Sequence, residues 1–204
     1  MLTLPLVAGK KPSAVPLMKL PPKTAEVAAL ALPPLGQKCA NWAWASELEV
    51  MLKGQQVSLN QNYWVQKANG GEVCVETLPS LEDLTRLVDG AYVLDDGRKV
   101  RLVSKAIDGA PGIPDDVIGP LREGRPLLMF WKGRALAVRA VVYDEYIYPN
   151  GQRMFQIREM KMVDPLLPGK DGELGFVTGR DDASQITGIY RVVVEPVKTQ
   201  PWQR

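Results

Sequence analysis

Side chains that could carry covalent or acid–base chemistry are few in this chain of 204 residues. It contains no histidine, and its only thiols are those of Cys39 and Cys74. The lack of histidine removes the most common general base and most protein metal sites. No glycine-rich phosphate loop, Ser–His–Asp set or zinc-ligand spacing occurs either. We therefore expect neither a cofactor nor a metal.

The clearest local pattern is a polar loop that leads into an apolar helix. Trp44, Leu48 and Met51 recur at the spacing that places side chains on one face of a helix. This predicts a mostly buried helix over residues 41–53. Gly54 follows at the position where a left-handed C-cap is common.

The start of this helix also carries a motif. Gln37 stands six residues before Ala43, which lies inside the sequence Asn-Trp-Ala-Trp-Ala. The motif resembles the oxyanion glutamine and nucleophile helix of bacterial papain-like cysteine peptidases, with Ala43 at the position of the catalytic cysteine. In that family the helix N-terminus lowers the pKa of the thiol, and the glutamine amide is the second oxyanion donor. The resemblance assigns that donor role to Gln37, and Cys39 is out of register for the nucleophile.

The C-terminal half is similar to the same family. Arg134 follows a glycine and opens an apolar strand, at the place where the family has its catalytic histidine. Asp164, in the sequence Val-Asp-Pro, resembles the aspartate that orients this histidine. These segments follow the family order over residues 35–195. The resemblance thus implies that Gln37 and Asp164 are kept, while Ala43 and Arg134 replace the nucleophile and the base.

Hydrophobic periodicity and turn residues predict the remaining elements. Ser58 and Ser80 are candidate N-caps, and Tyr63 and Trp64 are expected to point inward. We expect helices over residues 59–68, 80–88 and 114–123, a hairpin of 92–94 and 99–103, and strands over 127–131, 134–144, 153–163, 174–178 and 188–194. The order of elements predicts an α+β fold, consistent with a papain-like helical lobe followed by an antiparallel β-sheet or barrel lobe.

Composition separates two parts of the chain. Residues 1–34 contain seven prolines and are expected to form an extended arm that lies on the body, although residues 24–30 could form one or two helical turns. Residues 35–204 are expected to form the papain-like domain, with a mainly helical lobe over 35–124 and a β lobe over 125–204.

The charge and hydropathy of the chain limit the classes of partner that we expect it to bind. The net charge is +2 and no basic stripe is visible, so we expect no nucleic-acid partner. No apolar run is long enough to span a membrane. A peptide or protein ligand in the cleft is the partner that the resemblance implies. Localisation stays open: secreted or periplasmic if a signal sequence was removed, and cytoplasmic otherwise.

Several functional alternatives remain. The resemblance implies an inactive peptidase with a peptide-binding cleft, either a natural pseudopeptidase or a variant inactivated on purpose. The alternative is an active peptidase or hydrolase with another nucleophile, such as Cys39. Cys39 and Cys74 are either two buried thiols or one disulfide. Arg134 either binds a carboxylate, together with the helix N-terminus and Gln37, or pairs with Asp164 and closes the cleft.

Overall fold

One antiparallel sheet organises the fold, which is of the α+β class. A computed structural model describes residues 18–27, 36–74, 78–167 and 172–197. Within them, nine strands form a sheet of order β3-β4-β9-β5-β6-β7-β8, with β1 and β2 also paired to β6. The strands are β1 (Met18–Lys19), β2 (Lys23–Glu26), β3 (Gly90–Val93), β4 (Lys99–Asp108), β5 (Leu127–Trp131), β6 (Arg134–Ile147), β7 (Arg153–Val163), β8 (Glu173–Val177) and β9 (Ile186–Pro196). The helices are α1 (Ala43–Lys53), α2 (Gln61–Asn69), α3 (Leu81–Val88), α4 (Asp115–Arg122) and the 3₁₀ turn η3 (Ala183–Gln185).

Helix α1 is the deeply packed helix that its apolar spacing predicts. Leu48 is fully buried, and Trp44 and Met51 are almost so. The prediction of a left-handed C-cap at Gly54 is wrong, because Gly54 has a right-handed φ of −59°. The chain makes one more turn through hydrogen bonds from residues 55 and 56 to the end of the helix, and the positive φ of 61° falls at Gln56.

Helix α2 begins later than expected. Its N-cap is Asn60, whose side chain accepts a hydrogen bond from the backbone N–H of Tyr63, so the prediction of Ser58 as the cap is wrong. Trp64 is fully buried as predicted, but Tyr63 is 37% exposed. Successive helical residues point about 100° apart, so both rings cannot face the same core. Gly70 ends the helix in the left-handed conformation.

Helices α3 and α4 follow their predicted ranges closely. Ser80 caps α3 by accepting a hydrogen bond from Asp83 N–H at 3.1 Å, as its spacing predicts. Pro114 is the N-cap of α4 rather than its first residue. Pro120 lies inside α4, and the helix continues past it to Arg122.

Strand β6 is the longest strand and pairs with several partners. Its first part pairs with β5, and the rest of the same edge pairs with β2 and β1. Residues 18–27 are therefore extended along the body. Thr24 pairs with Val142 in this ladder, so the expectation of helical turns fails for residues 24–26, and residues 28–30 lie outside the described part.

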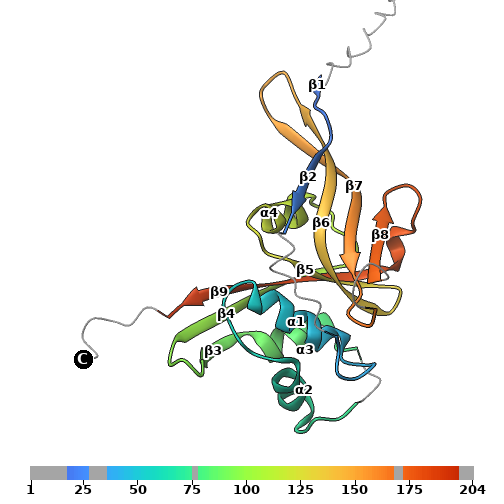
Figure 1. Cartoon of the computed structure of the whole chain (residues 1–204). Coiled ribbons are helices and arrows are strands. Elements are labelled where there is room, and N and C mark those ends of the chain that lie inside the picture. The colour runs from blue at the N-terminus through green and yellow to red at the C-terminus, as the bar shows by residue number, and fades with distance from the viewer. Residues whose placement is uncertain (1–17, 28–35, 75–77, 168–171, 198–204) are drawn as a thin grey trace, which may run out of the picture.

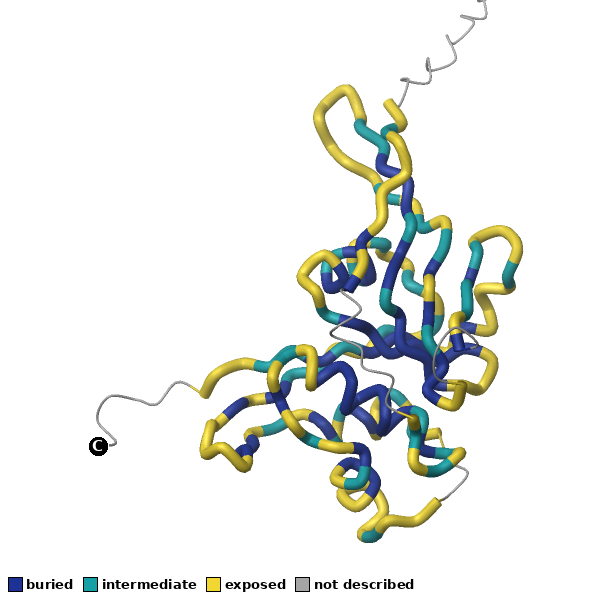
Figure 2. Tube along the Cα trace, viewed as in Figure 1, coloured by how far each residue is buried: buried dark blue, intermediate teal, exposed yellow. Residues whose placement is uncertain are grey.

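Two apolar cores meet at the central strands (Figure 2). Strand β5 is buried along its whole length, and its side chains alternate between the cores, because successive strand residues point to opposite faces. Phe130 packs with α1, α2 and α3, whereas Met129 packs with α4 and β2. Strands β3 and β4, from the first half of the chain, join the same sheet through β9. Helix α1 is therefore fixed on the sheet close to the start of β6.

Candidate functional site

A cavity of about 250 Å³ lies where the loop before α1 meets the start of β6. The four positions singled out by the resemblance, Gln37, Ala43, Arg134 and Asp164, all line it. The other lining residues are Ala40, Asn41, Leu78, Gly133, Ala135 and Leu166. The fold thus brings together residues from both halves of the chain.

Ala43 forms one wall of the cavity. It is the first residue of α1, and the N-cap Trp42 makes no side-chain hydrogen bond to the helix. The side chain ends at Cβ, so this wall offers a methyl group where a nucleophile would need a thiol or hydroxyl. The buried face of α1 holds the position firmly.

Gln37 lines the cavity, and its amide nitrogen is hydrogen-bonded to the loop that carries it. Gln37 Nε2 donates to the carbonyl of Ala40 at 2.7 Å. Gln37 Oε1 is buried and has no hydrogen-bond partner among the described residues. One N–H of the amide is thus used within the loop, and the donor role that the resemblance assigns to Gln37 stays a prediction.

A buried glutamine that sequence analysis missed holds this loop in place. Gln61 Oε1 accepts from the N–H of Lys38 at 2.8 Å, and Gln61 Nε2 donates to the carbonyl of Gly36 at 3.4 Å. Its own N–H donates to Glu49 Oε2 on α1 at 2.9 Å. Gln61 thus fixes the backbone on both sides of Gln37. A polar residue on the buried side of α2 was the only signal in the sequence.

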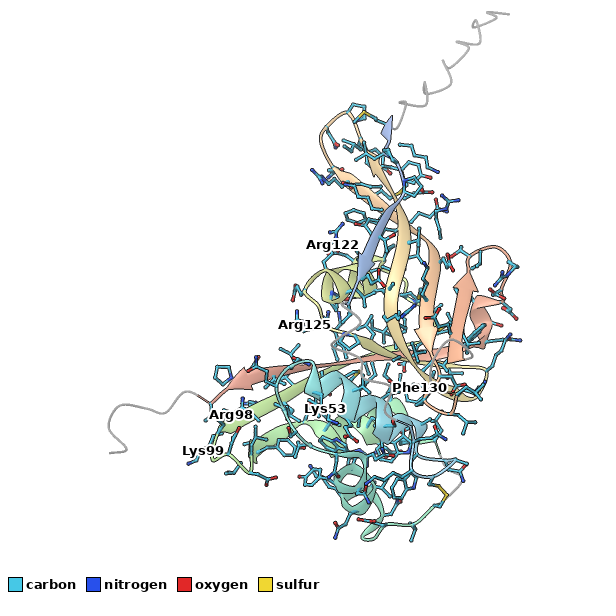
Figure 3. All side chains as sticks on the ribbon, viewed as in Figure 1. Lys53, Arg98, Lys99, Arg122, Arg125 and Phe130 are labelled. Atoms are coloured by element: carbon cyan, nitrogen blue, oxygen red, sulfur yellow. A yellow bond between two sulfur atoms is a disulfide. The ribbon has the colours of Figure 1, made fainter. Side chains whose placement is uncertain are left out.

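Cys39 and Cys74 form a disulfide, with their Cα atoms 6.0 Å apart (Figure 3). Of the two states left open by the sequence, this is the one the structure contains. Trp42 Nε1 also donates to the carbonyl of Val73 at 3.1 Å. These contacts tie the site loop to the segment after α2. Cys39 therefore has no free thiol to act as a nucleophile.

Arg134 and Asp164 form an ion pair through Nη2 and Oδ2. The Asp164 side chain is only 3% exposed, while that of Arg134 is 42% exposed. Asp164 Oδ1 accepts from the N–H of Leu166 at 2.9 Å. A two-residue turn with positive φ at Lys132 and Gly133 joins β5 to β6 and places Arg134 at the cavity. The expected pairing of Arg134 with Asp164 is therefore observed, but the pair leaves the cavity open and does not close it.

A second carboxyl lies behind the cavity. Glu47 is one helical turn after Ala43 and only 2% exposed, and its Oε2 has no hydrogen-bond partner among the described residues. Burial raises the pKa of Glu47 well above its ordinary value, and the nearby negative charge of Asp164 adds to this. Glutamate four residues after Ala43 was visible in the sequence, but its burial was not.

The thiol and imidazole of a cysteine peptidase are both absent from the described lining of the cavity, so no nucleophile–base pair exists there. In the described parts of the chain, no cluster of three or more cysteine, aspartate or glutamate side chains is placed to hold a metal. No described helix is long and apolar enough to cross a membrane.

Comparisons with known proteins add no relative. No family model matches the chain, and no curated protein or solved structure is significantly similar to it. The likeness to papain-like peptidases therefore remains one of motifs and of their order along the chain.

Proposed function

We propose that this chain is a papain-like domain that lacks peptidase chemistry and binds a peptide or protein segment at the Ala43 cavity. One observation supports this most directly. Gln37, Ala43, Arg134 and Asp164 line a single cavity, and the two at the catalytic positions carry side chains unable to do the reaction.

The loss of catalysis follows from the side chains themselves. The methyl group of Ala43 cannot attack a carbonyl carbon. The guanidinium of Arg134 stays protonated at any physiological pH and cannot accept a proton. Without nucleophile and base, a site of this kind retains at most roughly 10³–10⁴-fold acceleration over water. We therefore expect no detectable peptidase activity.

Binding is supported by the space and by its lining. A volume of about 250 Å³ is close to the lower end of ligand pockets, roughly 300 Å³. Leu78 and Leu166 are 40% and 48% exposed and give the cavity an apolar rim. Such a site suits one residue or one end of a peptide.

Restoring the missing pair tests the assignment of these positions. In the double variant Ala43→Cys, Arg134→His, the new thiol should titrate well below the free value of about 8.5, because imidazole and helix N-terminus both favour the thiolate. The rate of alkylation by iodoacetamide against pH measures this. The single variants are the matched controls: the thiol of Ala43→Cys, which lacks the imidazole, should titrate closer to the free value than that of the double variant, and Arg134→His, which adds no thiol beside the Cys39–Cys74 disulfide, should not be alkylated.

Two results would contradict the proposal. A folded double variant whose thiol titrates near 8.5 would mean that Arg134 does not occupy the base position. Labelling of the unreduced natural protein in the cavity by a thiol-directed reagent, dependent on Cys39, would favour an active enzyme with Cys39 as its nucleophile. The Cys39–Cys74 disulfide predicts no such labelling.

A further inference from the structure

The charges that line the cavity cancel each other. Among the described residues, the charged ones that line it are Arg134 and Asp164, and they are paired. Asp164 is almost fully buried, so water screens its charge weakly. Glu47, which is buried behind the cavity, is an acid and therefore cannot supply a compensating positive charge. A carboxylate entering this site would lose its water without gaining a net opposite charge.

The hydrogen-bonding groups at the cavity are mixed rather than all donors. Arg134 uses Nη2 for Asp164 and, being 42% exposed, has other N–H groups left to donate. Asn41 offers both an amide oxygen and an amide nitrogen; the nitrogen makes only a long 3.9 Å contact with Cys74 Sγ. Gln37 Oε1 has no partner among the described residues, but it is buried and so is not counted among the acceptors that a ligand can reach. A carboxylate can only accept, whereas an amide both donates and accepts.

We infer that the cavity selects a neutral amide group, as in a peptide bond, an Asn or Gln side chain or an amidated C-terminus, over a carboxylate. This depends on the proposed peptide-binding function and names the chemical group that the site takes. The amide oxygen accepts from Arg134, and the amide nitrogen donates to Asn41 Oδ1. The Arg134–Asp164 ion pair causes this selectivity, because the guanidinium can still donate hydrogen bonds while Asp164 cancels its charge.

Two probes of nearly equal size test this selectivity: N-acetylglycinamide and N-acetylglycine. The methyl groups of Ala40, Ala43 and Ala135 line the cavity and can be followed by NMR after ¹³C labelling of alanine methyls. We expect the amide to shift these signals with a dissociation constant roughly tenfold lower than that of the acid, a difference of about 1.4 kcal/mol.

A variant that changes the charge balance sharpens the test. Asp164→Asn keeps the shape but leaves Arg134 without a counter-charge, so the preference should reverse towards N-acetylglycine. The matched control is Asp115→Asn, which removes the same charge from an exposed residue at the start of α4. The control should keep the preference for the amide.

The outcomes separate this inference from the proposed function. Equal or tighter binding of the acid to the natural protein would overturn the amide selectivity while leaving a binding cavity. The same holds if the folded Asp164→Asn variant keeps the original preference. If neither probe moves the alanine methyl signals, the cavity does not bind peptide groups, and the proposed function falls as well. The natural protein alone decides between the probes, even if the variant does not fold.

Discussion

Two buried glutamates, one beside the cavity and one in the long β6–β7 hairpin, meet opposite environments. Glu47 on α1 has an oxygen without a hydrogen-bond partner among the described residues, and burial raises its pKa. Glu145 on β6 accepts from Lys23 at 2.5 Å and from Arg153 at 2.7 Å. The hydrogen bond from Lys23 is the main cause that lowers the pKa of Glu145. Burial alone therefore decides neither the charge nor the stability contribution of an acid.

The acids of the hairpin region are paired with basic residues, although Asp144 Oδ1 is buried without a hydrogen-bond partner among the described residues. Asp144 and Glu145 are neighbours on β6 and point to opposite faces of the sheet, and they bind Lys19 and Lys23 of the N-terminal segment. Arg122 at the end of α4, labelled in Figure 3, donates to the hydroxyl of Tyr143 on this hairpin. Its guanidinium also lies over the Tyr143 ring. Two lysines thus hold the segment from both faces.

The cavity region also contains buried polar atoms without partners in the described parts of the chain. Gln37 Oε1 and Glu47 Oε2 are buried there without partners among the described residues. Such atoms occur in both regions, so they do not by themselves distinguish the cavity from the hairpin.

The largest expected effect concerns the apolar packing that holds the cavity wall. Leu48→Ala should lower the free energy of unfolding by about 2–5 kcal/mol, because a fully buried leucine leaves a void beneath α1. Urea unfolding measures this, with Leu166→Ala, at a half-exposed position, as the control. A loss below about 0.5 kcal/mol would contradict the central place of α1.

The next effect has the opposite sign. Glu47→Gln should raise the free energy of unfolding at pH 7 by about 1 kcal/mol or more, since one unit of pKa shift is worth about 1.4 kcal/mol. Because the folded-state pKa is raised, the natural protein loses stability as pH increases from about 4.5 towards that folded value. Unfolding followed from pH 4 to 8 should show this decline in the natural protein and a smaller one in the variant. Equal profiles would show that Glu47 is paired after all.

The smallest effect belongs to the hairpin. Glu145→Gln should lower the free energy of unfolding by about 1 kcal/mol at pH 7, because its partners Lys23 and Arg153 are 44% and 61% exposed and water weakens both pairs. The folded-state pKa of Glu145 is lowered, so its contribution is present above its ordinary value of 4.5. That contribution is lost as pH falls through the folded value.

Salt and acid should therefore reduce the difference in free energy of unfolding between the Glu145→Gln variant and the natural protein. Urea unfolding at pH 7 and pH 3 measures this difference. The exposed pair of Asp96 and Arg98 gives the control, since Asp96→Asn should change stability little. A gap for Glu145→Gln that persists at pH 3 would mean that the carboxylate charge is not what holds the segment.

Much of the secondary structure was determined by local sequence. The strands at 127–131 and 153–163 have the predicted bounds, and those beginning near 134, 174 and 188 differ by a few residues at their ends. Apolar runs bounded by turn residues depend only on neighbouring side chains, so they can be recognised from the chain alone. The α+β class followed from the order of these elements.

Only the tertiary structure decided how the cavity is built. The sequence left open whether Arg134 pairs with Asp164 and whether Cys39 bonds to Cys74, and both contacts are made. The sequence likewise did not show that the amide nitrogen of Gln37 donates to the carbonyl of Ala40 or that Glu47 is buried near Asp164. These features join residues far apart in the chain. Hydrogen bonding, ion pairing and desolvation depend on distances of a few ångströms, which exist only once the sheet and α1 have packed together.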